Sequence, residues 1–348
     1  NNGKKKLLKQ IEVKGKYEAS RYTVKRLYIQ GRDTTSIPVS LVYKREIFRK
    51  GKNPLFIYAY GSYGISVDAG FSASRISLLD RGFVFAIAHV RGGQELGRKW
   101  YEDGRMLNKK NTFNDFIDIT KGLIKLGYGD SDRVYAGGGS AGGLLLGAVI
   151  NMEPNLYRGI ISNVPFVDLI TTMSDPSIPL TTGEYSEWGN PTNKEEFDYM
   201  LSYSPYDNIG KFSYPSVLVT TGLWDSQVQY YEPAKYVAKL REFSKSNNPI
   251  LIKINLLGAD ETENGLQEKM NGIFHHLNRI KNSYLSVSNE VIEHNKFKPM
   301  NNLLNGFTKI LSEIDPNVYL VKNNADNDMF QRCKINLKSC EDYKLSKE

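Results

Sequence analysis

A serine lies at a glycine-rich bend between a strand-like and a helix-like segment. Ser140 is the centre of the pattern G-x-S-x-G at residues 138–142, which follows the apolar run 134–136 and precedes the apolar segment 144–152. A nucleophile must project from the sheet edge on a turn so tight that neighbouring side chains would clash, and glycines on both sides meet that need. The N-terminus of the next helix would stabilise the negative charge that develops during acyl transfer. These residues predict a nucleophilic serine.

The other interpretation of this segment is a glycine loop that binds phosphate. A P-loop would carry a lysine directly after the glycines, and a dinucleotide-binding loop would be followed by an acidic residue at the end of the next strand. Neither signal is present after residue 143. The pattern therefore favours the nucleophile.

An acidic residue follows a later strand-like run, where this chemistry needs one. A serine hydroxyl requires a base and the base requires an orienting acid, in the chain order Ser, Asp, His for this kind of bend. Asp225 comes shortly after the run 215–221, and catalytic groups of open parallel sheets gather at the carboxyl ends of strands. Taken alone, an Asp on such a loop would more often cap a turn. In this context we predict that Asp225 is the acid.

The histidine that should complete the set is missing from its expected loop. The strand-like run 250–255 is followed by residues 256–262, which contain no histidine. His89 precedes Ser140 at the end of a strand-like run and is interpreted as structural. The remaining histidines are His275, His276 and His294, and any of them would have to return to Ser140 from the distant tail, because a triad is defined by geometry and not by spacing.

Short apolar runs alternate with helix-like stretches through most of the chain. The strand-like runs are 27–29, 37–43, 55–60, 83–89, 134–136, 217–221 and 250–254, and the helix-like stretches include 114–126, 144–152 and 233–243. Runs that are apolar throughout indicate strands buried on both faces. The pattern predicts an α/β fold with a mostly parallel sheet and helices on both faces.

The composition is that of a folded chain. It has 348 residues, 40% of them hydrophobic and 11% aromatic, which suits one large α/β domain with an appendage, or two domains. No apolar run approaches the roughly 18 residues that a membrane span needs, so we expect no membrane partner. The 46 Lys and Arg exceed the 38 Asp and Glu by eight, but they are scattered. We therefore expect no nucleic-acid partner.

The two cysteines and the N-terminus bear on cofactors and compartment. Cys333 and Cys340 form neither a disulfide framework nor a four-ligand zinc site, so we expect no metal and no cofactor. Few cysteines suit a reducing cytoplasm. The opening residues 1–6 lack the apolar core of a secretion signal, and a first residue that is not methionine suggests a fragment or a processed chain.

A change in composition near residue 258 divides the chain. Asn makes up 14 of the 91 residues from 258 onward but only 15 of the 257 before it. We predict first strands in residues 1–50, the main α/β domain in residues 51–257 and a divergent Asn- and Lys-rich tail in residues 258–348.

Six blocks of sequence give the chain a resemblance to a known family. From about residue 10 to 257 it resembles the catalytic domain of the oligopeptidase B branch of the prolyl oligopeptidase family of serine peptidases. The resemblance implies an α/β-hydrolase fold and cleavage of short peptides after Lys or Arg. The blocks are 60–64, 89–93, 138–143, 179–185, 187–191 and 225–228.

The resemblance assigns roles to residues of the reaction centre. Ser140 matches the family's nucleophile and Asp225 its triad acid. Tyr60 matches a tyrosine whose hydroxyl helps to stabilise the oxyanion, and the backbone N–H of Ala141 is the second donor. Two donors aimed at the developing oxyanion are what acyl transfer requires.

The resemblance also implies substrate-binding acids. Glu184 matches a residue that holds the Lys or Arg before the scissile bond, and Asp68 one that favours a basic residue further upstream. Carboxylates select cationic side chains by charge-assisted hydrogen bonds. The family has acidic partners two residues beyond each, where this chain has Ser186 and Gly70, and their loss would weaken a preference for paired basic residues.

The departures from the family suggest a further hypothesis. Asp260 occupies the place of the triad histidine, the resemblance stops there, and the chain begins near the end of the family's N-terminal β-propeller. One hypothesis explains all three: the chain is a piece of a split or frameshifted gene, whose propeller is supplied by a separate chain.

Three functions are consistent with these residues. The first is a serine-type endopeptidase whose partners are short basic peptides and whose rate is reduced by the missing base. The second is an inactive remnant that at most binds basic peptides through Glu184 and Asp68. The third, an esterase, needs the same base.

Overall fold

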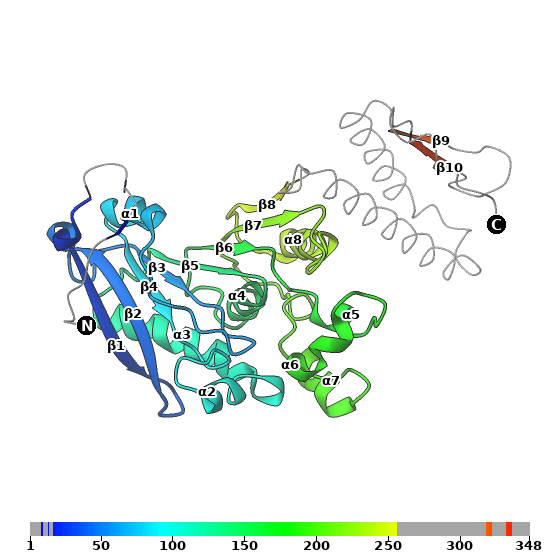
Figure 1. The fold of residues 1–348 in the computed structure, drawn as a ribbon, viewed down its shortest axis with the longest axis horizontal. Helices are drawn as coiled ribbons and strands as arrows, with labels where there is room; N and C mark the ends of the chain where they lie inside the picture. The colour runs from blue at the N-terminus through cyan, green and yellow to red at the C-terminus, as the bar shows by residue number, and fades with distance from the viewer. Residues whose placement is uncertain (1–7, 10–12, 14–16, 256–317, 322–331, 336–348) are drawn as a thin grey trace. The chain divides into compact units, whose positions relative to one another are not determined.

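The computed structural model describes residues 8–9, 13, 17–255, 318–321 and 332–335 (Figure 1). Contacts divide the chain into two units, Asn1–Ile273 and Phe274–Glu348. In the second unit, β9 (Val318–Val321) and β10 (Arg332–Ile335) pair antiparallel. The predictions for the tail, including those for Asp260 and the three tail histidines, concern residues outside the described ones.

The first unit is built on an eight-stranded sheet in the order β1-β2-β4-β3-β5-β6-β7-β8. The pairs β1–β2 and β2–β4 are antiparallel, and all later pairs are parallel. The strands are β1 (Tyr22–Gln30), β2 (Ser36–Lys44), β3 (Leu55–Tyr58), β4 (Val84–Ala88), β5 (Val134–Gly139), β6 (Gly159–Asn163), β7 (Ser216–Gly222) and β8 (Ile250–Asn255).

Helices and 3₁₀ turns connect these strands. The α-helices are α1 (Ala73–Asp80), α2 (Arg98–Glu102), α3 (Lys110–Lys125), α4 (Ala141–Met152), α5 (Leu169–Met173), α6 (Tyr185–Trp188), α7 (Lys194–Leu201) and α8 (Tyr231–Phe243). The 3₁₀ turns are η1 (Ala19–Arg21), η2 (Arg45–Ile47), η3 (Met106–Asn108) and η4 (Thr181–Glu184). Among the described residues, no helix is long and apolar enough to cross a membrane.

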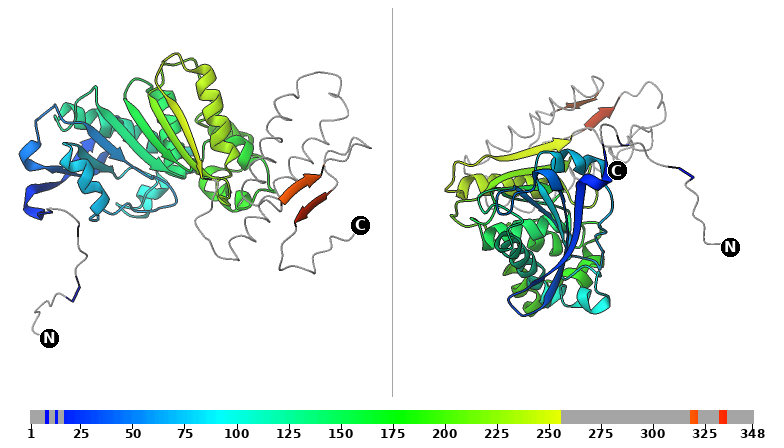
Figure 2. Two further views of the ribbon diagram at one scale, coloured as in Figure 1. Left: turned by 90° about the horizontal axis from the view of Figure 1, so that it is seen from above. Right: turned by 90° about the vertical axis from the view of Figure 1, so that its left-hand side faces the viewer.

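The helices cover both faces of the sheet. α3 packs on β1 and β2, α4 on β5 and β6, and α8 along β7 and β8, whereas α1 packs on β2 and β4 from the other side (Figures 1 and 2). The central helix α4 is buried from Ala141 to Ile150 because it lies between the sheet and the segments around it. The predicted α/β fold with a mostly parallel sheet is confirmed.

The prediction from sequence missed one strand and made some other elements too short. β6 was not predicted, because its five residues contain only two large apolar side chains, Ile160 and Ile161. The predicted helix 144–152 begins three residues earlier, at Ala141, since glycines in its first turn hide the helical pattern. The predicted strand 27–29 is part of the longer β1, whose residues are mostly exposed and whose apolar residues are interrupted by Lys25 and Arg26.

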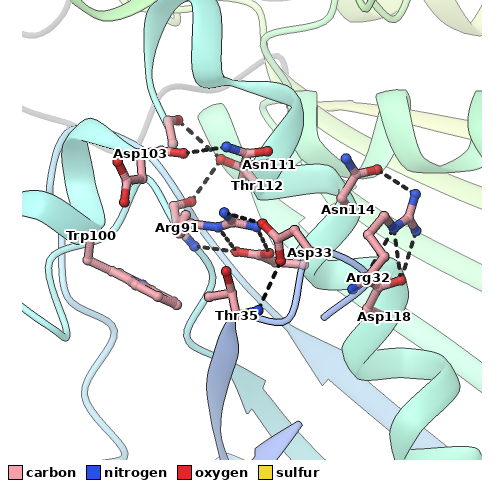
Figure 3. A network of polar contacts seen from close by, with 12 residues as sticks. Arg32, Asp33, Thr35, Arg91, Trp100, Asp103, Asn111, Thr112, Asn114 and Asp118 are labelled. Atoms are coloured by element: carbon pink, nitrogen blue, oxygen red, sulfur yellow. Dashed lines mark hydrogen bonds and ion pairs between the residues drawn. The ribbon is translucent and has the colours of Figure 1, made fainter. Parts of the chain in front are cut away.

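A buried ion-pair network joins the β1–β2 turn to α3 (Figure 3). Arg91 donates from its side chain to Asp115 at 2.5 and 2.9 Å, and its backbone N–H donates to the same carboxylate at 3.0 Å. The guanidinium also pairs with Asp33 of the turn at 2.7 Å. Beside it, the exposed Arg32 pairs with the partly buried Asp118 at 2.8 Å. This network fixes the loop 89–93, which was one of the family-like blocks.

Candidate active site

Ser140 lies on a strained bend at the carboxyl end of β5. Its φ is 54° and its ψ is −119°, a combination that a residue with a side chain rarely adopts. A Cβ added at Gly138 would lie 2.5 Å from the Gly142 oxygen, and one at Gly142 would lie 2.7 Å from the Ala59 oxygen. The glycines are therefore required by close backbone approach, as the G-x-S-x-G pattern predicts.

Backbone hydrogen bonds hold this bend in place. The N–H of Ser140 donates to the Asn163 oxygen at 2.9 Å, and the Ser140 oxygen accepts from the N–H of Phe166 at 3.1 Å. Both partners belong to the end of β6 and the loop after it. The half-buried serine is therefore fixed from the neighbouring strand, which sequence reasoning had missed.

The two residues predicted to stabilise the oxyanion lie beside Ser140. Tyr60 follows β3, and burial raises the pKa of its hydroxyl while a side-chain hydrogen bond with Ser140 opposes the rise. Ala141 is the first residue of α4, where backbone N–H groups have no partner within the helix. The structure thus brings a phenol donor and a helix N-terminal amide to the serine.

A fully buried lysine supports the loop that carries Tyr60. Lys109 donates to the Gly61 oxygen and to Ser62 Oγ, both at 2.6 Å, and its nitrogen lies 5.0 Å from the centre of the Trp188 ring. Burial lowers its pKa to about 8. Lys109 is a positioning residue, and its sequence neighbourhood of Lys and Asn gave no sign of burial.

Glu184 is held on the far side of Tyr60. The hydroxyl of Tyr63 donates to Glu184 Oε2 at 2.7 Å, and Trp188 Nε1 donates to the same oxygen at 3.2 Å. The rings of Tyr60 and Tyr63 are 6.3 Å apart. Contacts therefore run continuously from Ser140 through the two tyrosines to Glu184. Within the described part of the chain, Glu184 has no cationic partner, so a cation from outside could pair with it.

Asp225 lies on the loop after β7, as predicted. Its Oδ1 accepts from the N–H groups of Gln227 and Val228, each at 2.9 Å. Because β6 separates β5 from β7, Ser140 and Asp225 follow strands that are about 10 Å apart, twice the usual strand spacing. That separation requires a bridging group between hydroxyl and carboxylate. The one histidine among the described residues, His89, does not serve, because Arg26 and Ser40 hold it at the other side of the sheet order.

Two other predicted residues lie apart from this centre. Asp68 is exposed on the loop between β3 and α1, and no described contact joins it to Glu184. His89 is buried and its Nε2 lies 2.9 Å from Ser40 Oγ and 2.6 Å from an Arg26 nitrogen, which agrees with a structural role. Among the residues with described placement, no three His, Cys, Asp or Glu side chains gather where they could hold a metal ion.

The buried carboxylate of Glu232 joins α8 to the segment after β6 through hydrogen bonds. Glu232 Oε1 accepts from the N–H of Asp168 at 2.7 Å, and Oε2 accepts from Thr172 at 3.1 Å. Lys235, one turn further along α8, pairs with the Asp168 carboxylate. Since α8 follows the Asp225 loop directly, these hydrogen bonds and this ion pair fix that loop relative to the bend of Ser140.

Glu232→Gln should make the protein more stable at pH 8. Burial, opposed by hydrogen bonds and reinforced by the charge of Asp168, raises the pKa of Glu232 to about 8 from an ordinary value near 4.5. Because the folded state binds this proton more tightly than the unfolded chain does, protonation of Glu232 stabilises the folded state. That contribution is complete below pH 4.5. It is lost as pH rises to about 8, by up to about 1.4 kcal/mol per unit.

Urea unfolding of both proteins at pH 5 and pH 8 measures this effect. The glutamine variant should lose less stability between the two values, because it has no proton to release. Glu195→Gln, at an exposed position of α7, is the control and should follow the parent. Equal losses in parent and Glu232→Gln would contradict the prediction.

The chain matches a known peptidase family. Residues 69–257 match the prolyl oligopeptidase family, which is more than half of the chain. Among characterised relatives, 255 residues are 57% identical to dipeptidyl aminopeptidase BI of Pseudoxanthomonas mexicana, covering 73% of this chain and 35% of that protein. Protease 2 of Moraxella lacunata is 46% identical over 285 residues, which cover 82% of this chain and 40% of that protein.

Solved structures agree with these relatives. Oligopeptidase B from Leishmania major superposes with a TM-score of 0.68 at 49% identity, over 70% of this chain and 34% of that one. Oligopeptidase B from Trypanosoma brucei with covalently bound antipain, in a closed form, gives a TM-score of 0.72 at 44% identity, over 80% and 40%. The chain therefore spans between a third and two fifths of the length of these relatives.

Proposed function

The chain belongs to the prolyl oligopeptidase family of serine peptidases, and on that premise we propose that it hydrolyses short peptides on the carboxyl side of Lys or Arg. The observation that carries the proposal is the continuous set of contacts from Ser140 through Tyr60 and Tyr63 to Glu184, which has no cationic partner among the described residues. It supports a nucleophile and a carboxylate for a cationic side chain within one site.

In the proposed reaction, Ser140 Oγ bonds to the carbonyl carbon of the substrate and its proton passes to a base oriented by Asp225. The hydroxyl of Tyr60 and the N–H of Ala141 stabilise the oxyanion. Collapse of the tetrahedral intermediate breaks the C–N bond, and the leaving amine takes the proton from the base. Water then attacks the acyl carbon and gives a proton to the base, and the bond between that carbon and Ser140 Oγ breaks as Oγ takes the proton back.

The base is the component that decides how fast this reaction runs. A triad that lacks its histidine retains only the acceleration from the oxyanion donors and from binding, which is orders of magnitude below the full rate. We propose a reduced rate, because the sequence has no histidine between Asp225 and His275.

The two cysteines also support a cytoplasmic location.

Glu184→Gln should lower kcat/KM for cleavage after Arg or Lys by about 10- to 100-fold, because a charge-assisted hydrogen bond contributes roughly 1.5–3 kcal/mol. The substrates are N-blocked coumarin amides that differ only in Arg, Lys or norleucine before the scissile bond. Norleucine lacks the charge, so its kcat/KM should not change.

Glu195→Gln, at an exposed position of α7, is the matched control and should leave kcat/KM for all three substrates unchanged. Equal effects of Glu184→Gln on the cationic and the neutral substrates would contradict the proposed pocket. If nothing is cleaved, a folded chain that also fails to react with a fluorophosphonate would instead be the inactive, peptide-binding remnant.

A second candidate is the removal of dipeptides from a free N-terminus. It is favoured by the 57% identity with a relative that is named as a dipeptidyl aminopeptidase. A pair of dipeptidyl coumarin amides, one blocked and one with a free amine, separates the two. Cleavage of the free form alone would support dipeptide removal, and cleavage of both would support the endopeptidase.

A further inference from the structure

The two oxygens of Glu184 have unequal surroundings. Oε2 accepts from Tyr63 OH at 2.7 Å, and it shares the single N–H of Trp188 with the Tyr63 hydroxyl, each at 3.2 Å, so two donors already face that oxygen. No donor among the described residues reaches Oε1. A cation that enters the site therefore finds one available oxygen on this carboxylate.

Tyr63 is fixed in the position from which it donates. Its φ is +60°, which is unusual for a bulky residue, and its N–H donates to the buried carboxylate of Glu187 at 2.9 Å. Its ring packs edge-on against Trp188 at 5.7 Å, and Trp188 Nε1 also reaches its hydroxyl at 3.2 Å. Burial and the neighbouring Glu184 raise the pKa of the Tyr63 hydroxyl well above its ordinary value, so it keeps its proton at physiological pH.

Occupation of one oxygen affects guanidinium and ammonium ligands differently. Arginine gains from a carboxylate through two parallel N–H···O bonds, which require both oxygens. Lysine is a compact charge that can be satisfied by one oxygen. Ser186, which is exposed and lies two residues after Glu184, offers no second carboxylate to restore the paired contact.

We propose that Tyr63 is a specificity-determining residue that blocks the paired contact between Glu184 and arginine and thereby makes the site accept lysine and arginine about equally. This inference rests on the proposed function, in which Glu184 receives the cationic side chain.

Calorimetric binding of acetyl-arginine methylamide and acetyl-lysine methylamide tests the proposal without requiring turnover. The parent should bind both within about threefold. Tyr63→Phe keeps the ring and removes the donor, so it should raise the ratio of arginine to lysine affinity by about tenfold. Trp188→Phe removes the other donor to Oε2 and should shift the ratio in the same direction. Tyr28→Phe, at an exposed tyrosine, is the control and should leave the ratio unchanged.

The outcomes separate this inference from the proposed function. If Glu184→Gln weakens both ligands while Tyr63→Phe and Trp188→Phe leave their ratio within twofold of the parent, the pocket stands and the role of Tyr63 is overturned. If Glu184→Gln weakens neither ligand, the pocket itself is wrong, and the inference falls with it.

Discussion

Replacing Ser140 with glycine should abolish labelling by a fluorophosphonate and at the same time raise the free energy of unfolding by about 1–2 kcal/mol. Labelling is lost because the reactive oxygen is removed. Stability rises because the backbone at φ 54° and ψ −119° costs a residue with a Cβ about 1–3 kcal/mol, whereas glycine adopts it with little strain. If the glycine variant gains stability as it loses reactivity, the backbone at this bend is strained in order to present the nucleophile.

Ser140→Ala separates the two effects. Alanine also lacks the oxygen, so labelling should disappear, but it keeps the Cβ and should leave the free energy of unfolding within about 0.5 kcal/mol of the parent. Gel fluorescence after probe treatment and urea unfolding measure the two quantities. Ser131→Ala, at an exposed serine, should keep both parent values. Persistent labelling of the glycine variant would show that another residue reacts.

Replacing Asp115 with alanine should lower the free energy of unfolding by about 3–5 kcal/mol, because it leaves the buried guanidinium of Arg91 without its main partner. The two side chains are 1% and 7% exposed, and Asp115 accepts three hydrogen bonds from Arg91. Asp33 would remain on the guanidinium, but it is 40% exposed and compensates poorly.

Asp118→Ala is a matched control three residues further along α3. Asp118 is 14% exposed and accepts hydrogen bonds from the backbone and side chain of Arg32, but the guanidinium of Arg32 is 46% exposed and stays hydrated, so the loss should be about 1–2 kcal/mol, clearly below that of Asp115→Ala. Urea unfolding gives the free energy of unfolding of both variants, and m-values equal to that of the parent make the free energies comparable. Similar losses for Asp115 and Asp118 would contradict the view that burial makes the difference.

The fold could be predicted because its central strands are apolar throughout. Runs such as 55–60 and 134–136 indicate strands covered on both faces, and such strands require a helix-covered parallel sheet. The elements α5, α6 and α7 could not be predicted, since each is at most eight residues long and too short to show a helical period.

Only part of the candidate site was readable from the sequence. The glycine spacing around Ser140 gives a direct physical signal, and the position of Asp225 follows from the strand before it. The roles of Tyr60 and Glu184 came from family resemblance. Lys109 and Tyr63 could not be found, because they act through hydrogen bonds to a loop and to a carboxylate that lie far away in the sequence.

The position of β5 in the middle of the sheet bears on how the molecule acquires its reactive centre. Leu55 pairs with Val134, and β6 must then join on the other side before the amide of Ser140 finds its acceptor. Such distant parallel pairings form late in folding, since the entropy of closing long loops must be overcome first. A partly folded chain would thus lack the strained bend that presents Ser140, and probe uptake would report the fraction of molecules that have completed folding.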